Sequence, residues 1–398
     1  MTYNFDEIIP RRHTESIKWN ICDADELPMW VADMDFRAPE PVIRALRERV
    51  AHGIFGYGKC PTGLRKVIVE RLQQLYDWQV KPQELVFLPG VVPGFHLALR
   101  AFTSPGEGLL IQTPVYPPIL HAAANADLVS NAMTLTRMSD GHYEIDWELF
   151  EKTLTPHTRM FLLCNPHNPV GRVFRRDELE RMAEICLRHD LLICSDEIHG
   201  DLLFSGYAHH PIASLAPEIE ARTITLMAPS KTFNIAGLDC SFAVIPNAEL
   251  RQRFKAARRG LVGRPNVLGY VAALAAYRAG QPWLDAVLTY LEANRDFLQA
   301  YVAERLPGLN MASPEGTYLA WLDCREAGIP GNPYEFFRRE ARVMLNDGAT
   351  FGPGGEGFVR LNFACPRAQL VEGLERMRSA LAGLILNAET QRRKGAKF

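Results

Sequence analysis

A lysine stands inside the segment 228–238, which reads Ala-Pro-Ser-Lys-Thr-Phe-Asn-Ile-Ala-Gly-Leu and follows an apolar, strand-like run. A lysine amine that loses its proton in a desolvated site can form a Schiff base with a carbonyl compound. Most loop lysines are only solvated charges. A catalytic role for this residue, Lys231, is therefore indicated only if other polar residues are predicted to lie near it.

Two polar turns upstream of Lys231, at 165–171 and 195–199, each follow a short apolar run of the strand type. The first reads Asn-Pro-His-Asn-Pro-Val-Gly and the second Ser-Asp-Glu-Ile-His. In an open parallel sheet, the carboxyl ends of the strands meet at one edge. The order of the turns therefore predicts that Asn168, Asp196 and Lys231 face one crevice, which is how a cofactor site is built.

The elements that must position these residues alternate along the chain. We expect strands at 85–88, 109–111, 159–164, 191–194, 223–227 and 242–245, and helices at 62–76 and 177–188. This alternation predicts a mostly parallel sheet covered by helices. Further on, we expect long helices to about residue 302, strands near 318–322 and 358–363, and helices near 333–339 and 366–384.

The order of the motifs resembles that of one enzyme family. The three segments above are followed by Arg-Leu-Asn-Phe-Ala-Cys-Pro-Arg at 360–367, an order similar to that of the fold-type I, pyridoxal-phosphate-dependent, aminotransferase-like enzymes. Segments at 11–20, 27–36 and 53–57 narrow the resemblance to the MalY/PatB type of cystathionine β-lyase. The resemblance covers essentially the whole chain.

The resemblance implies an α/β fold with a three-layer large domain around a mostly parallel sheet and a smaller α+β domain. A chain of 398 residues is long enough for one large and one smaller domain. We expect residues 1–45 to form an N-terminal arm and part of the small domain. Residues 46–285 would form the large cofactor-binding domain, and residues 286–398 the C-terminal small domain.

The cofactor implied by the resemblance is pyridoxal 5'-phosphate. Two residues would bind it and assist its chemistry most directly. Lys231 would hold it by an imine and, once displaced by substrate, remove the substrate α-proton. Asp196 would pair with the pyridinium nitrogen, because a nearby carboxylate raises the proton affinity of that nitrogen.

Other residues would hold the cofactor ring. Asn168 would donate to the phenolate oxygen, although an asparagine in a Pro-rich loop is also a common turn residue. His199 lies where relatives place a residue near the same oxygen, and it could equally be a packed polar side chain. Tyr116, in Thr-Pro-Val-Tyr-Pro-Pro, would lie on one face of the ring and share in catalysis, and Ile198 would pack on the other face.

A phosphate site is expected where Pro-Gly-Val-Val-Pro-Gly at 89–94 follows a strand and precedes a helix. Backbone amides at a helix start attract anions, which makes Gly90, Val91 and Val92 the candidates. The family arrangement adds the hydroxyl of Ser230, with Ser195 as a further candidate.

Two features of the phosphate site follow from the resemblance alone. Tyr57 would reach the phosphate from the neighbouring subunit, which requires a homodimer. Many aminotransferases carry an arginine eight residues after the lysine, whereas this chain has Asp239 there. An acidic residue cannot repeat that contact, so either the loop differs or the phosphate depends on backbone and hydroxyl groups.

The substrate's α-carboxylate would bind Arg360, since the planar guanidinium fork suits recognition at two points. Trp30, Asp33 and Asp35 would shape the substrate entrance, although a purely structural role is an equal alternative for them.

Composition excludes several other classes of function. A net charge of −2 and 47% hydrophobic residues describe a globular protein with no electrostatic reason to bind nucleic acid or a membrane surface. The eight scattered cysteines predict reduced, mostly buried thiols and a cytoplasmic location. Adjacent His209 and His210 lack metal-ligand spacing and are expected in a solvated turn, so no metal site is predicted.

The leading functional hypothesis is a carbon–sulfur β-lyase that cleaves L-cystathionine or related L-cysteine conjugates to a thiol, pyruvate and ammonia. The alternative is an aminotransferase acting on an L-amino acid and a 2-oxo acid, because the cofactor residues do not choose the outcome. A purely regulatory binding protein ranks lower, since Lys231, Asp196 and Arg360 are all present.

Overall fold

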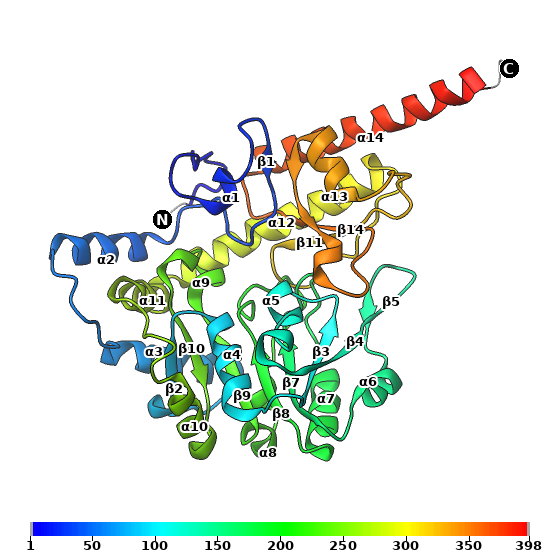
Figure 1. Cartoon of the computed structure of the whole chain (residues 1–398). Helices are drawn as coiled ribbons and strands as arrows, with labels where there is room; N and C mark the ends of the chain where they lie inside the picture. Colours follow the sequence, from blue (N-terminus) through cyan, green and yellow to red (C-terminus); the bar gives the residue numbers. More distant parts are fainter. Residues whose placement is uncertain (1–2, 396–398) are drawn as a thin grey trace.

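A seven-stranded sheet forms the centre of the larger part of the molecule (Figure 1), in the order β2-β10-β9-β8-β7-β3-β4. The computed structural model describes residues 3–395, with side chains up to residue 384. The strands are β2 (Leu85–Leu88), β3 (Gly108–Thr113), β4 (Val129–Thr134), β7 (Thr158–Cys164), β8 (Leu192–Asp196), β9 (Thr223–Met227) and β10 (Ser241–Val244). All neighbouring pairs are parallel except the two made by β10, which confirms the expected mostly parallel sheet.

Helices cover both faces of this sheet because successive side chains of a strand point to opposite sides. In β7, Leu162 belongs to the core that includes helix α4 (Val91–Phe102), whereas Leu163 belongs to the core that includes α7 (Arg176–Arg188). Buried on both faces, the strands are continuous apolar runs, which is why the sequence predicted them well.

The remaining helices of the larger part alternate with these strands along the chain. They are α2 (Glu40–Ala51), α3 (Thr62–Tyr76), α5 (Pro117–Leu120), α6 (Trp147–Thr153), α8 (Pro217–Glu220), α9 (Pro229–Thr232), α10 (Ala248–Arg258) and α11 (Val267–Ala279). Two short strands, β5 (Thr136–Arg137) and β6 (Tyr143–Glu144), pair separately.

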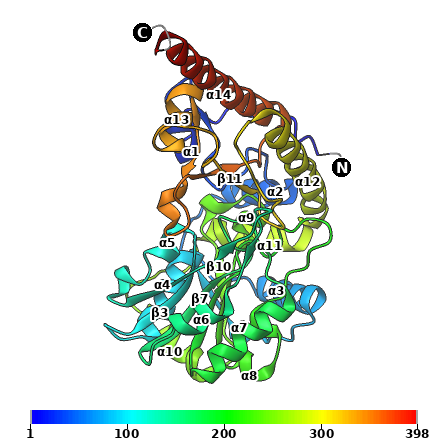
Figure 2. The same ribbon diagram turned by 90° about the vertical axis from the view of Figure 1, so that its right-hand side faces the viewer.

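A smaller group of elements lies beside one end of the large sheet (Figure 2). Its antiparallel sheet has the order β11-β14-β13, and its elements are β11 (Leu319–Asp323), α13 (Pro333–Phe336), β13 (Asn346–Asp347), β14 (Phe358–Asn362), α12 (Gln281–Arg305) and α14 (Arg367–Gly395). Helix α12 runs through the predicted domain boundary at 285/286, and the division into domains stays a prediction.

The N-terminal segment packs with this smaller group. Helix α1 (Ile17–Asn20) precedes β1 (Leu27–Pro28), which pairs in parallel with β12 (Val343–Met344). Met29 and Phe36 share one apolar core with side chains of α12 and β14. The described N-terminal segment and the smaller group are therefore held together by one hydrophobic core.

Within the large sheet, β4 is the strand that the sequence did not predict. It lies at the edge of the large sheet and carries the exposed Ser130 and the buried polar Asn131. An edge strand is covered less than a central one, so it lacks the apolar run that marks the others.

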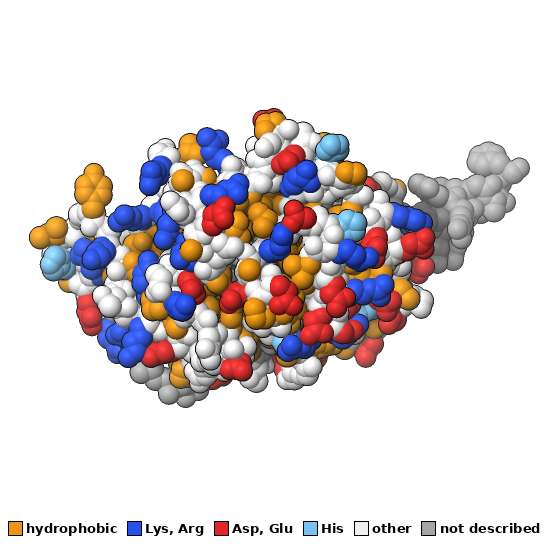
Figure 3. Space-filling model, turned by 90° about the horizontal axis from the view of Figure 1, so that it is seen from below, with side chains coloured by type: hydrophobic (Ala, Val, Ile, Leu, Met, Phe, Trp, Pro, Cys, Tyr) orange, Lys and Arg blue, Asp and Glu red, His pale blue; other side chains and the backbone are white. Residues whose placement is uncertain are grey.

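Basic and acidic side chains are interspersed over much of the face seen from below (Figure 3), in keeping with the small net charge. None of the helices within residues 3–395 is both long and apolar enough to cross a membrane.

Candidate active site

A cleft of about 500 Å³ opens at the carboxyl ends of the central strands. Asn168 follows β7, Asp196 ends β8 and Lys231 lies in α9, directly after β9; all three line the cleft. Their convergence is the outcome expected from three neighbouring parallel strands.

The amine of Lys231 lines the cleft and donates a hydrogen bond to the carbonyl oxygen of Ala32 over 2.7 Å. Desolvation, followed by the charge of nearby Arg360, lowers the pKa of Lys231 to about 8, while Asp33 and Asp196 oppose the shift. The uncharged amine, which a nucleophile or base requires, is therefore more populated near neutral pH than in a solvated lysine.

Asp196 is a buried carboxylate without an ion-pair partner among the described residues. One of its oxygens accepts a hydrogen bond from the backbone N–H of Ile198 over 3.1 Å. Burial raises the pKa of Asp196 to about 7, because the charged form has lost its water. A cation placed against this carboxylate would stabilise its ionised form.

Arg360 lies on β14, opposite Asn346 of β13, and its side chain is buried. Its guanidinium donates to the side-chain oxygens of Asn168 over 2.9 Å and Asn346 over 2.6 Å, and to the carbonyl oxygen of Trp30 over 3.0 Å. Burial lowers the pKa of Arg360 to about 10, and its Nε has no hydrogen-bond partner. An unneutralised guanidinium with a free donor is suited to bind a carboxylate.

Three further predicted residues line the cleft: Tyr116, Ile198 and His199. Tyr116 begins the turn into α5, and its backbone N–H donates to the carbonyl oxygen of Asn168 over 3.0 Å. His199 is buried, and its Nδ1 has no partner. Burial, followed by the charges of Lys231 and Arg360, lowers the pKa of His199 to about 3, so the ring is neutral.

The predicted phosphate residues are among those that line the cleft. Gly90 precedes the first turn of α4, and Gly90, Val91, Val92 and Ser230 all line the cleft. Asp239 also lines it. The suggestion for Ser195 is wrong: its hydroxyl is buried and donates to Glu197 over 2.8 Å, since adjacent residues of a strand face opposite ways.

Three predicted residues lie outside this cleft. The carboxylate of Asp33 pairs with Arg11 over 2.7 Å, that of Asp35 pairs with Lys18 over 2.7 Å, and neither residue lines the cleft. Tyr57 is fully exposed and lines a separate groove with Arg264 and Val267. Its predicted role requires a second subunit and stays a prediction.

The solvated turn expected at His209 is wrong. His209 is buried, and its Nε2 lies 2.9 Å from a carboxylate oxygen of Glu197. The backbone N–H of Ile212 also donates to Glu197, over 3.3 Å. The tertiary contact with the end of β8 overrides the polar character of the His-His-Pro turn.

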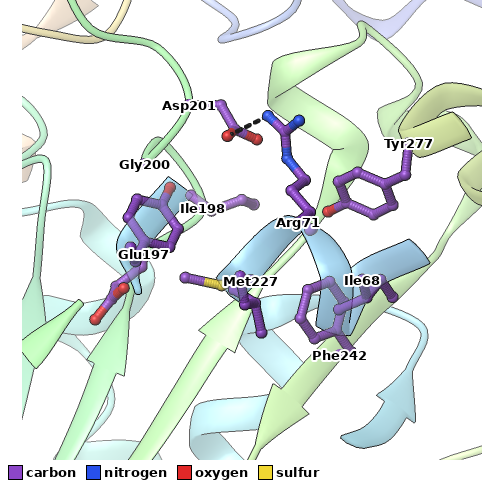
Figure 4. A pocket seen from close by; sticks show the side chains of 12 residues that line it. Ile68, Arg71, Glu197, Ile198, Gly200, Asp201, Met227, Phe242 and Tyr277 are labelled. Carbon is purple, nitrogen blue, oxygen red and sulfur yellow. Dashed lines mark hydrogen bonds and ion pairs between the residues drawn. The ribbon is translucent and has the colours of Figure 1, made fainter. Parts of the chain in front are cut away.

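Figure 4 shows a second, smaller cavity of about 20 Å³. It shares Ile198 and Ala228 with the cleft. Arg71 of α3 and Asp201 form an ion pair there, over 2.7 Å. The other oxygen of Asp201 accepts a hydrogen bond from the hydroxyl of Thr232 over 3.0 Å. Arg71 and Asp201 thus brace the residue that follows Lys231.

Sequence reasoning missed four contributors: the carbonyl of Ala32, Tyr318, Asn346 and Phe351. Tyr318 also donates to the carbonyl oxygen of Ala32, over 2.8 Å, and Phe351 lies with its ring 5.0 Å from the guanidinium of Arg360. A backbone carbonyl and an isolated asparagine carry no signal in a single sequence.

No group of three or more His, Cys, Asp or Glu within residues 3–395 is arranged to hold a metal ion.

Residues 27–377 match the sequence profile of the family described as aminotransferase class I and II. The chain belongs to this family. The predicted family relationship is thereby confirmed.

Individual relatives place the chain within the family. It is 41% identical over 388 residues to cystathionine β-lyase PatB of Bacillus subtilis. The matched residues make up 95% of this chain and 100% of that relative. This chain is 33% identical over 389 residues to protein MalY of Escherichia coli, covering 95% and 99%. The chain thus lies in the MalY/PatB branch of the fold-type I enzymes.

A solved structure adds the cofactor. The crystal structure of a PLP-bound putative aminotransferase from Clostridium difficile is similar to this chain with a TM-score of 0.93 and 39% identity, covering 96% of this chain and 100% of that one. The prediction of pyridoxal 5'-phosphate is confirmed. The cleft fits this group, since it offers a buried amine, a carboxylate without a cation and the first turn of a helix.

Proposed function

We propose that this protein is a pyridoxal-phosphate-dependent carbon–sulfur β-lyase that cleaves L-cystathionine or related L-cysteine conjugates to a thiol, pyruvate and ammonia. The observation that carries the proposal is the convergence of Lys231, Asp196 and Arg360 on one buried cleft. The similarity to cystathionine β-lyase PatB supports the choice of reaction.

The cofactor, when bound, supplies an electron sink for the bonds at the substrate Cα. Lys231 holds it covalently and, when released, takes the Cα proton, for which its lowered pKa supports an uncharged amine. Asp196 would hold the ring nitrogen of the cofactor, whose positive charge would supply the cation that this buried carboxylate lacks.

The phosphate is held by the backbone amides of Gly90, Val91 and Val92 and by the hydroxyl of Ser230. Asp239 cannot contribute a positive charge, so amide and hydroxyl donors of this subunit carry the binding. Tyr57 of a neighbouring subunit completes the site, because in its own subunit it is exposed and lies outside the cleft.

Arg360 binds the substrate α-carboxylate, with its unpartnered Nε as one of the donors. Asn168 bridges Arg360 and the cofactor oxygen, while Tyr116 and Ile198 cover the two faces of the ring and exclude water. His199 stays neutral and packs beside the same oxygen. Trp30 borders the substrate entrance, and Asp33 acts indirectly, by pairing with Arg11 and anchoring the segment that holds Trp30.

The protein acts as a homodimer in the cytoplasm. Three exposed apolar side chains of the segment before α3, namely Ile54, Phe55 and Tyr57, support a second copy at this surface. Eight free cysteines, seven of them buried, support a reducing compartment. Mass measurement in solution tests the dimer, and a monomer with full activity would contradict it.

An aminotransferase is the alternative, favoured by the PLP-bound structure that is itself called a putative aminotransferase. Both reactions begin with loss of the Cα proton, and they differ in where the electrons go. The test is pyruvate release from L-cystathionine by the cofactor-loaded protein, with and without a 2-oxo acid. Steady pyruvate without an acceptor supports the lyase; amine transfer that needs the acceptor supports the aminotransferase.

A further inference from the structure

The wall of the cleft beside Arg360 is aromatic and apolar. Five residues form what we call the aromatic wall: Trp30, Val31, Tyr116, Pro117 and Phe351. They come from the N-terminal segment, from the start of α5 and from the turn before β14, so only the folded chain brings them together.

Two residues of the aromatic wall contact Arg360, the proposed site of the substrate α-carboxylate. The carbonyl oxygen of Trp30 accepts a hydrogen bond from Arg360 over 3.0 Å, and the guanidinium lies 5.0 Å from the ring of Phe351. The indole N–H of Trp30 donates to the carbonyl oxygen of Lys18 over 3.1 Å. Because that polar atom is already bonded, Trp30 presents mainly carbon to the cleft.

Both cationic side chains of the cleft are already committed. Among the described residues that line it, the cationic side chains are Lys231 and Arg360, and the acidic ones are Asp196 and Asp239. Lys231 and Arg360 are needed for the cofactor and the α-carboxylate. The leaving group of cystathionine carries a second carboxylate and a second ammonium group, and a carboxylate taken from water without a partner is destabilising.

We propose that the preferred leaving group of this enzyme is an uncharged thiol carrying a planar aromatic ring, in place of the charged homocysteine released from cystathionine. The inference rests on the lyase function proposed above. Tyr116 is committed to the cofactor ring, so the side chain of Trp30 offers the free ring surface for offset stacking, and burial of an uncharged ring removes apolar area from water. The homocysteine group carries no ring for these contacts, and its carboxylate meets no uncommitted cation among the described residues that line the cleft.

The reaction stays balanced with any such thiol. The Cα–H and Cβ–S bonds break, a Cα–Cβ double bond forms, and the electron pair leaves with sulfur, which takes up a proton. The aminoacrylate that is released takes up one water to give pyruvate and ammonia. No oxidant or reductant is consumed.

The test compares three L-cysteine conjugates with the full-length, cofactor-loaded enzyme. S-benzyl-L-cysteine supplies the aromatic ring, S-(cyclohexylmethyl)-L-cysteine is a saturated control of similar size, and L-cystathionine supplies the charged group. From pyruvate release we expect kcat/KM for the benzyl conjugate to exceed that for cystathionine by about tenfold or more, with the cyclohexyl conjugate between them. Equal or better use of cystathionine overturns the inference and leaves the lyase function intact. Absence of pyruvate from all three overturns both.

A variant tests whether the aromatic wall is the cause. Trp30→Ala keeps the backbone carbonyl that holds Arg360 and removes the indole. We expect kcat/KM for the benzyl conjugate to fall about tenfold and several-fold more than kcat/KM for cystathionine, which also passes this residue, with most of the loss recovered in Trp30→Phe. Tyr207→Ala, at an exposed loop aromatic, is the matched control and should change neither. An equal loss for both substrates in Trp30→Ala would show that the indole only maintains the fold, and would overturn the inference.

Discussion

Arg360 and Asn346 stand opposite each other on neighbouring antiparallel strands, and the guanidinium of Arg360 donates to the side-chain oxygen of Asn346 over 2.6 Å. The contact aims the guanidinium at the cleft without neutralising it, because the partner is an amide. A carboxylate at position 346 would compete with the substrate for the same charge.

We therefore predict that Asn346→Asp raises KM for L-cysteine conjugates more than Asn346→Ala does. The two variants differ in charge at this position, and the alanine variant removes only one orienting hydrogen bond. Steady-state kinetics on pyruvate release measure both. A larger effect of alanine than of aspartate would assign Asn346 a role in orientation alone.

Replacing Arg360 by alanine should lower kcat/KM by about 10²-fold or more, since each hydrogen bond to a charged group contributes about 1.5–3 kcal/mol. The rise in KM should dominate. The absorbance spectrum of the bound cofactor should stay unchanged, with Arg360→Lys showing a partial effect. Loss of the cofactor from the alanine variant would mean that Arg360 holds the cofactor and not the substrate.

Replacing Lys231 by alanine should abolish turnover and covalent attachment of the cofactor, because no other lysine lines the described cleft. Borohydride reduction followed by mass spectrometry measures the attachment. Lys66→Ala, at an exposed lysine of α3, is the control and should retain both. A Lys231→Ala protein with full lyase activity would remove the central assignment.

The stability of the cofactor-free protein should depend on Asp196. Burial raises its pKa in the folded state to about 7, so between about pH 4 and pH 7 the folded protein holds a proton that the unfolded chain has released. The free energy of unfolding therefore falls as pH rises through this window, by a few kcal/mol from this residue. Urea unfolding of wild type and Asp196→Asn at several pH values measures the difference, which should grow toward pH 7. Parallel pH profiles for the two proteins would contradict the assignment.

Arg71→Ala should destabilise the protein by about 3 kcal/mol, because it leaves the partly buried carboxylate of Asp201 without its cation. The double variant Arg71→Ala/Asp201→Ala should cost less than the sum of the single variants. Thermal unfolding of wild type, the two single variants and the double variant gives the four values of a double-mutant cycle. Additive effects would show that this ion pair contributes no coupling energy.

Sequence patterns predicted the elements that carry the chemistry because each pattern is local. The central strands are buried on both faces and read as continuous apolar runs, and helix α3 was predicted at the bounds observed, Thr62–Tyr76. Asn168, Asp196 and Lys231 could be grouped in advance because the ends of parallel strands meet at one edge of the sheet. Edge strand β4 was missed because half-exposed residues weaken the same signal.

What the sequence alone determined is therefore the family, the cofactor and the residues that end its central strands. Only the tertiary structure decided that His209 is buried against Glu197, that Asn346 orients Arg360, and that the carbonyl of Ala32 receives the amine of Lys231. These contacts join residues that are 12, 14 and 199 positions apart. Their energy comes from desolvation and hydrogen-bond geometry, which depend on how distant segments pack and leave no periodic trace in the chain.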